Sequence, residues 1–173
     1  MKSLYSTTVA FVAIFMIVPL VHAAPSFPSW SEKLGPNKRF TVLTAFNSEA
    51  VLDNETGLVW EQSPSQHRMT WNDAQLHCNQ MKAGNRFGWR LPTIQEFASL
   101  VDPATPDDLP PGHPFSNAPQ DYSWSATSDA IDNSFAWWVN LGFHASPPMG
   151  NGLGKANSAY AWCVRGGQGV DPQ

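Results

Sequence analysis

The chain is poor in charge and in cysteine. Charged side chains make up 14% of its 173 residues against 42% hydrophobic ones, so it is too apolar for a disordered tail and long enough for one ordinary domain. Basic residues are not in excess: the chain has 10 Lys and Arg and 14 Asp and Glu, so its formal net charge is -4. A protein that coats phosphates needs the opposite balance, so we expect no nucleic-acid partner. Long heptads and G-x-y repeats are absent as well, which excludes a long coiled coil and a collagen-like stalk.

The first residues predict export. One basic residue precedes an apolar run over 9–21, and the run ends in Val21-His22-Ala23, a small-x-small cleavage site. The run is shorter than the roughly 20 residues that a membrane-spanning helix needs, and no second segment is apolar enough to span. We therefore expect a signal peptide over 1–23, cleaved after Ala23, and a periplasmic or secreted mature chain. The alternative is an uncleaved membrane anchor.

The mature chain contains two cysteines, Cys78 and Cys163. An even count in an oxidising compartment favours one disulfide, which would close a loop of about 85 residues. Two buried free thiols are the alternative. A catalytic thiol is less favoured, because no third cysteine is left over and no neighbouring His is placed to activate one.

Aromatic and turn-forming residues are abundant: 8 Trp, 15 Pro and 12 Gly predict a loop-rich fold with an aromatic core. Capping-box patterns mark two helix starts, Thr70 with Asp73 and Thr93 with Glu96. In chain order we expect an extended leader (24–39), a strand (40–46), a hairpin (50–61), a helix (70–82), a shorter helix (93–101), a long loop (102–120), two strands (122–125 and 135–141), an irregular stretch (142–158), a terminal strand (160–165) and a tail (168–173). This order is typical of an α+β domain, here over 40–167.

Five motifs then occur in the order of a known family. They read LDNETGLVWE at 52–61, WNDA at 71–74 followed by Cys78, WRLPT at 89–93 followed by Glu96, YSWS at 122–125 and WCVRGG at 162–167. In these motifs the chain resembles the family named for the C-terminal domain of the Legionella collagen-like protein, the Lcl C-terminal domain family. The resemblance covers nearly the whole predicted domain.

The resemblance implies a C-type-lectin-like fold, with two helices packed on small antiparallel sheets, long loops and one disulfide. In that fold a cysteine of the first helix pairs with one in the last strand, and Cys78 and Cys163 occupy those positions. The family is catalogued as a domain of unknown function. Its namesake resembles a surface adhesin for sulfated glycosaminoglycans and host proteins, whereas this chain lacks collagen-like repeats and is acidic overall.

Catalytic and metal motifs are not found. Trp71-Asn72-Asp73 has the letters of a lectin calcium motif, but it opens a helix, and the stretch 142–158, where that motif would lie, contains no acid. No histidine pair has metal-ligand spacing, and neither G-x-S-x-G nor H-E-x-x-H occurs. We therefore expect no metal, no cofactor and no catalytic residue. An enzyme related to formylglycine-generating, sulfatase-modifying proteins is the enzymatic alternative, although those rely on an active-site cysteine pair.

We expect the function to be noncovalent recognition of a glycan or protein ligand, independent of calcium. Adjacent Trp residues put one ring on each face of a strand, and an exposed ring offers a platform to a sugar or a protein. The expected ligand surface lies on loops 102–121 and 142–159, with candidate residues Trp137, Trp138, Asn140, Asn151, Lys155 and Asn157. A structural or assembly protein of the cell envelope is the alternative.

For three other groups of polar residues, the sequence is compatible with either a binding site or a solvated surface. Lys82, Arg86 and Arg90, with Arg68 as a candidate neighbour, form the only local basic cluster and are either anion-binding groups or solvated charges at the end of a helix. His113 and His144 lie in the two long loops. Four acids, Asp107, Asp108, Asp129 and Asp132, are either ligands of a metal site that is not of the lectin type or side chains of a solvated loop.

Overall fold

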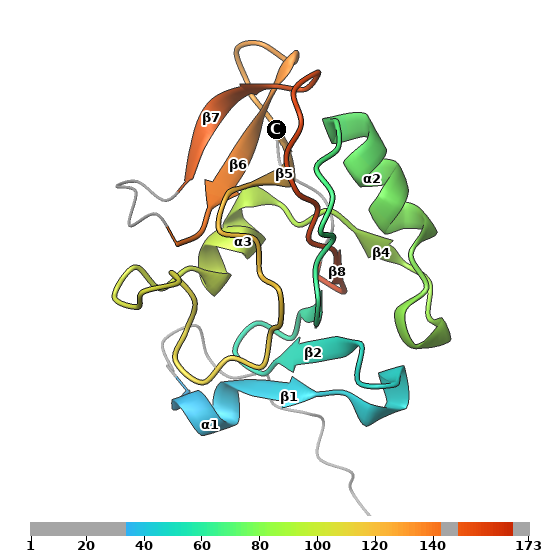
Figure 1. Ribbon diagram of the computed structural model, residues 1–173, viewed down its shortest axis with the longest axis vertical. Coiled ribbons are helices and arrows are strands. Elements are labelled where there is room, and N and C mark those ends of the chain that lie inside the picture. Colours follow the sequence, from blue (N-terminus) through green and yellow to red (C-terminus); the bar gives the residue numbers. More distant parts are fainter. Residues whose placement is uncertain (1–33, 143–148, 168–173) are drawn as a thin grey trace, which may run out of the picture.

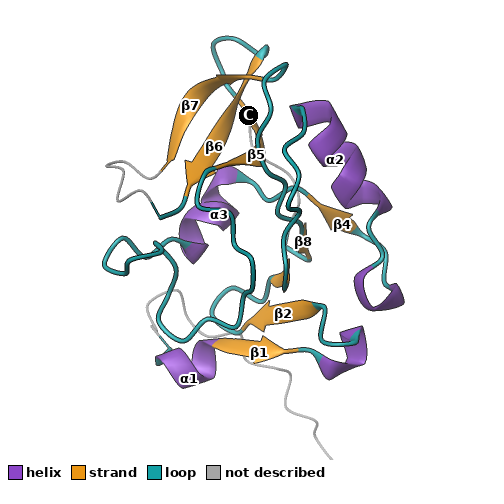
Figure 2. Ribbon diagram, in the orientation of Figure 1, coloured by secondary structure: helices purple, strands orange, loops and turns teal. Residues whose placement is uncertain are grey.

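The computed structural model describes residues 34–142 and 149–167, which form an α+β domain. A sheet of three strands lies at one end and the pair β1 and β2 at the other, and the loop that follows α3 reaches that second end before it returns to β5 (Figures 1 and 2). The elements are α1 (Pro36–Arg39), β1 (Phe40–Val42), η1 (Thr44–Phe46), β2 (Ala50–Asp53), β3 (Val59–Glu61), α2 (Trp71–Gln80), η2 (Ala83–Asn85), β4 (Trp89–Arg90), α3 (Ile94–Leu100), β5 (Tyr122–Ser128), β6 (Phe135–Asn140), β7 (Met149–Gly154) and β8 (Val164–Arg165).

The larger sheet is antiparallel with the order β1-β2-β3-β8-β4. Its hairpin forms as predicted: the Gly57 N–H donates to Asp53 O at 2.8 Å, and Gly57 adopts a φ of 73°, which strains any residue with a Cβ. Strand β8 comes last in the chain but lies between β3 and β4, where Val164 pairs with both Trp60 and Arg90. The C-terminal segment is therefore an inner strand of the sheet.

Both predicted helices begin at their predicted caps. The Thr70 hydroxyl accepts the Asp73 N–H at 3.3 Å at the start of α2, and Thr93 and Glu96 bond reciprocally at the start of α3. Glu96 also receives two hydrogen bonds of 2.7 Å from the Arg90 guanidinium, which donates a third to Gly166 O. The 89–93 motif thus ties α3 to β4 and to the end of β8.

Aromatic side chains fill the core, as the composition predicts. In one cluster Trp60, Phe97 and Trp162 contact each other with ring centroids 5.6–5.9 Å apart. A second cluster contains Trp89 and Trp124 together with the disulfide. Large aromatic side chains bury much apolar area, and tilted and edge-on packing suits their ring quadrupoles.

The predicted disulfide is present. Cys78 of α2 is bonded to Cys163, which directly precedes β8, across a separation of 85 residues, and both side chains are fully buried. The bond therefore fixes α2 against the inner strand of the large sheet.

Several local predictions are wrong in part. Of the expected extended leader, Pro36–Arg39 forms the helical turn α1, because Pro36 fits a first helical position and the Arg39 guanidinium is buried in an ion pair with Asp53; residues 24–33 lie outside the described part. The first strand ends at Val42 rather than at residue 46 and is followed by η1. The terminal strand is only Val164–Arg165, although Tyr160 bridges to Ser123.

The composition of 142–158 predicts an irregular stretch, but part of it is the edge strand β7. Gly150 makes room for an aromatic ring of the neighbouring strand, because a Cβ there would lie 2.7 Å from Trp138 Cζ2. Glycine in a strand marks such a close approach as well as a turn, which is why composition alone misassigned this segment. Within 34–142 and 149–167, no helix is long and apolar enough to span a membrane.

Replacing both cysteines tests how far the domain depends on the covalent link. We expect Cys78→Ala/Cys163→Ala to lose about 3–5 kcal/mol of unfolding free energy, since the link closes a long loop in the unfolded chain. Urea unfolding of the variant and of the reduced and oxidised wild type measures this loss. A variant within about 1 kcal/mol of the oxidised protein would contradict it.

Candidate functional site

The two adjacent tryptophans lie on opposite faces of the small sheet, and neither is fully exposed. Trp137 packs against the first core cluster. Trp138 is partly buried, with its ring above Gly150 and 4.7 Å from the ring of Tyr122 in an edge-on contact. Of the two rings, Trp138 is therefore the one beside an exposed aromatic side chain, since Tyr122 is 36% exposed.

The polar candidates differ in exposure and in their contacts. Asn140 is buried, and the Asn151 amide donates to Asp129 Oδ2 at 2.8 Å. The Lys155 ammonium donates to Ser128 Oγ at 2.6 Å and lies 4.0 Å from the centroid of the Trp71 ring, and burial lowers its pKa. Asn157 is exposed, with its amide next to Gly154. Asn151 and Lys155 therefore make contacts within the β5–β7 end of the domain, and the binding role of the predicted set stays a prediction.

The other polar candidates also have structural contacts. The His113 ring bonds to Asp107 Oδ2 at 2.8 Å and stacks on Phe115, whereas His144 lies outside the described residues. Asp129 accepts the N–H groups of Ile131 and Asp132, which lower its pKa, in the turn between β5 and β6. In the described part of the chain, no three His, Cys, Asp or Glu side chains come together in a way that suits a metal ion.

Three cations gather around two aromatic rings on one surface. Lys82 lies 5.1 Å from the ring of Phe87, and Arg86 and Arg165 lie 5.4 and 5.9 Å from the ring of Phe46. The Arg165 Nε–H also donates to Phe87 O at 2.8 Å. We call these five residues the basic–aromatic patch. Among the ion pairs of residues 34–142 and 149–167, none involves Lys82, Arg86 or Arg165.

The basic cluster predicted from sequence is thus partly right. Lys82 and Arg86 belong to the patch, but Arg90 is held by Glu96, and Arg68 forms an ion pair of 3.0 Å with Asp121 elsewhere. Arg165 is the cation that sequence reasoning missed. It joins the patch because β8 pairs with β4, which sets Arg165 opposite Trp89, and no local spacing shows that pairing.

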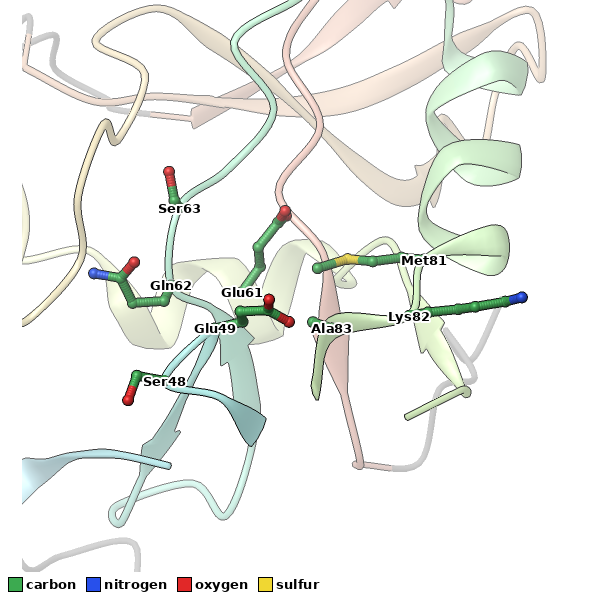
Figure 3. A pocket seen from close by; sticks show the side chains of 8 residues that line it. All are labelled: Ser48, Glu49, Glu61, Gln62, Ser63, Met81, Lys82 and Ala83. Carbon is green, nitrogen blue, oxygen red and sulfur yellow. The ribbon is translucent and has the colours of Figure 1, made fainter. Parts of the chain in front are cut away.

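A cavity of about 350 Å³ opens beside the patch, between the end of β3 and the end of α2 (Figure 3). Two carboxylates, Glu49 and Glu61, line it, so we call it the glutamate pocket. Met81 points its thioether toward Glu61, whereas Lys82 extends away from both carboxylates (Figure 3). The remaining lining residues are Ser48, Gln62, Ser63 and Ala83.

Backbone groups hold both carboxylates in place. Glu61 Oε2 accepts the Cys163 N–H at 3.2 Å, and Glu49 Oε2 accepts the Gly84 N–H at 2.6 Å. Burial raises the pKa of Glu61 from 4.5 to about 7, and the bond from Cys163 offsets part of that rise. Sequence reasoning missed this pocket, because neither glutamate belongs to a catalytic or metal-binding pattern.

The raised pKa of Glu61 predicts a pH-dependent stability. The folded chain keeps the Glu61 proton up to about pH 7, whereas the unfolded chain releases it near 4.5, so the unfolding free energy falls as the pH rises between these values. Glu61→Gln keeps an oxygen for the Cys163 N–H and carries no charge. We expect it to be more stable than wild type by roughly 1–3 kcal/mol at pH 8.

Urea unfolding at pH 4 and pH 8 measures this difference. At pH 4 the Glu61 side chain is neutral in wild type too, so the two proteins should then have similar stability. A variant that is equally or less stable than wild type at pH 8 would show that the Glu61 carboxylate is not desolvated.

The family comparison agrees with the motifs. Residues 49–165, more than half of the 173, match the Lcl C-terminal domain. No curated protein matches the sequence significantly. The matched range includes both strands of the hairpin, both capped helices, the disulfide, the basic–aromatic patch except Phe46, and both glutamates of the pocket. The chain belongs to the Lcl C-terminal domain family.

Proposed function

We propose that this chain is an exported, non-enzymatic binding module that recognises an anionic glycan without calcium, in an adhesin-like role at a cell surface or in the envelope. The observation that carries the proposal is the basic–aromatic patch. Three cations with no ion pair in the described part of the chain surround two aromatic rings there, and Phe87 is 63% exposed.

The chemistry of the patch suits a sulfated or carboxylated sugar chain. Guanidinium and ammonium groups form charge-assisted hydrogen bonds with sulfate and carboxylate oxygens, and an aromatic ring packs against the apolar face of a sugar ring. The net charge of -4 repels an anion only weakly at the patch, because salt screens charges beyond about 8–10 Å. The local cations therefore dominate close contacts.

Calcium has no part in this mode of binding. A calcium lectin coordinates sugar hydroxyls through an ion held by six to eight oxygen ligands. The patch offers positive charge directly from Lys82, Arg86 and Arg165, so the anionic groups of the ligand need no bridging cation.

A charge-matched pair of variants tests the site. We expect Lys82→Gln/Arg86→Gln to weaken binding of a sulfated glycosaminoglycan tetrasaccharide roughly tenfold or more, because two charge-assisted contacts are lost. Lys38→Gln/Arg68→Gln removes the same charge from exposed sites outside the patch and should change the affinity less than about threefold. Isothermal titration calorimetry at low salt measures both, with the desulfated tetrasaccharide as the ligand control.

Four other results of these binding measurements would each contradict one part of the proposal. Equal binding of the desulfated sugar would show that charge is not recognised, and loss of binding with chelator would show a need for metal. Loss confined to the control variant would move the site to Tyr122 and Trp138, because Arg68 pairs with Asp121 next to Tyr122 and lies 5.6 Å from the Tyr160 ring. Failure to bind any glycan would favour a protein ligand or an assembly role in the envelope.

Export is part of the proposal and rests on the first 23 residues of the sequence. Expressed with its own start in a bacterium, the chain should lose residues 1–23, and the product should begin at Ala24 with one disulfide. Intact-mass measurement of the periplasmic and medium fractions checks both features. A product that keeps residues 1–23 and stays with the membrane would support the anchor instead.

A further inference from the structure

Arg165 is held more firmly than the other two cations of the basic–aromatic patch. Its backbone lies in the inner strand β8, which pairs with β3 on one side and with β4 on the other (Figure 1). Its Nε–H donates to Phe87 O at 2.8 Å. In the described part of the chain, the side chains of Lys82 and Arg86 have ring contacts but no hydrogen bond. The fold therefore sets the position of the Arg165 guanidinium before any ligand binds.

One pair of donors on this guanidinium is left for a ligand. A guanidinium carries its N–H groups in one plane, in two parallel pairs: Nε with one Nη, and Nη1 with Nη2. The Phe87 carbonyl occupies the first pair through Nε. Among residues 34–142 and 149–167, no acceptor bonds to either Nη of Arg165, and no carboxylate forms an ion pair with it. The Nη1–Nη2 pair of this partly exposed side chain is thus a fixed, two-pronged donor.

We propose that Arg165 is the specificity-determining residue of the basic–aromatic patch, and that its Nη1 and Nη2 bind the carboxylate of a uronic acid unit whose sugar ring packs against Phe87. This inference rests on the proposed function, because it names the sugar unit that the same patch recognises.

The geometry of the free pair favours a carboxylate. Two parallel N–H groups in one plane match the two oxygens of a carboxylate, which lie in one plane with its carbon, and the resulting pair of charge-assisted hydrogen bonds is strong and directional. A sulfate ester spreads one charge over three oxygens in a tetrahedral arrangement, so a compact or mobile cation serves it as well. Lys82 and Arg86, which no hydrogen bond fixes among the described residues, are cations of that second kind.

The position of Phe87 links the charge to a sugar ring. Arg165 bonds to the carbonyl of this residue and passes beside the next one, because a Cβ on Gly88 would lie 3.8 Å from Arg165 Nε. The Phe87 ring itself is 63% exposed. In a uronic acid the carboxylate is attached directly to a ring carbon, so one sugar unit offers the anion and an apolar face side by side. Lys82, 5.1 Å from the same ring, adds a cation for a sulfate of the same chain.

Preorganisation makes Arg165 the residue on which discrimination depends. Ordering a long side chain at an interface costs about 0.5–1.5 kcal/mol, and a side chain that the fold has already ordered avoids most of that cost. Arg165 is ordered by β8 and by its bond to Phe87 O, whereas Lys82 and Arg86 have to be ordered by the ligand. Arg165 therefore presents a fixed shape that a ligand either fits or does not fit, and the other two cations contribute mainly charge.

A cycle of one protein change and one ligand change tests this contact. The ligands are a sulfated glycosaminoglycan tetrasaccharide with uronic acid units and its carboxyl-reduced form, in which each carboxylate is replaced by a primary alcohol. Arg165→Lys keeps the positive charge and loses the two-pronged donor. We expect it to bind the native tetrasaccharide at least about tenfold more weakly than wild type, because one ammonium does not replace two parallel bonds. With the carboxyl-reduced form, its affinity should lie within about twofold of wild type. Isothermal titration calorimetry measures all four affinities.

Two other arginines provide matched controls. Arg86→Lys makes the same chemical change inside the patch and should alter the affinities for both ligands by the same factor. Arg68→Lys makes it at an ion pair outside the patch and should alter neither affinity more than about twofold. Near-ultraviolet circular dichroism shows whether the variants are folded. A comparison on wild type alone does not depend on that folding: carboxyl reduction should weaken binding at least about threefold more than removal of an equal number of sulfates.

Three results would overturn the inference and leave the proposed function standing. An equal loss of both ligands in Arg165→Lys would show that Arg165 only supports the shape of the patch. Wild type that loses no more affinity on carboxyl reduction than on matched desulfation would show that the carboxylate is not read. An Arg165→Lys effect that disappears with the desulfated ligand instead would assign Arg165 to a sulfate. Wild type that binds no sulfated glycan at all would refute the proposed function, and this inference with it.

Discussion

The rest of the structure depends on the place of the C-terminal segment between β3 and β4. Val164 pairs with both strands, Cys163 is bonded to α2, and the Trp162 ring fills the core between Trp60 and Phe97. Just before it, residues 159 and 160 bond to Met69 and Tyr122, so the same segment also reaches the small sheet. One stretch of chain thus joins both sheets and the first long helix.

Both candidate sites inherit their geometry from that segment. Arg165 of β8 crosses to Phe87 and completes the basic–aromatic patch, and the N–H of Cys163 holds the Glu61 carboxylate. A side chain on a surface loop samples many rotamers, and fixing it costs about 1–2 kcal/mol on binding. Here the side chains beside β8 are already ordered in the folded protein by the disulfide and the hydrogen bonds. Binding therefore loses less side-chain entropy at these positions, which is the physical reason to look for ligand sites beside β8.

Sequence reasoning succeeded where the signal is local. The capping boxes at Thr70 and Thr93, the turn at Gly57 and the pairing of Cys78 with Cys163 all follow from short spacings or from compartment, and the structure confirms them. It failed where a residue acts across the fold. The glycine-rich stretch of β7 has the composition of an irregular loop, yet it forms an edge strand in which Gly150 lies against the Trp138 ring. The C-type-lectin-like comparison stays a prediction.

The two sites also show how an acidic chain keeps its charges apart. Lys82 lines the glutamate pocket but extends away from Glu49 and Glu61 to lie over Phe87 (Figure 3). Were it turned inward, an ion pair would neutralise both surfaces at once. Exposed ion pairs of this kind stabilise a protein by only about 0–1 kcal/mol, so the cation–π contact with Phe87 is strong enough to compete. Keeping like charges together costs stability through their mutual repulsion, and a scaffold with a disulfide across a long loop has stability to offset that cost.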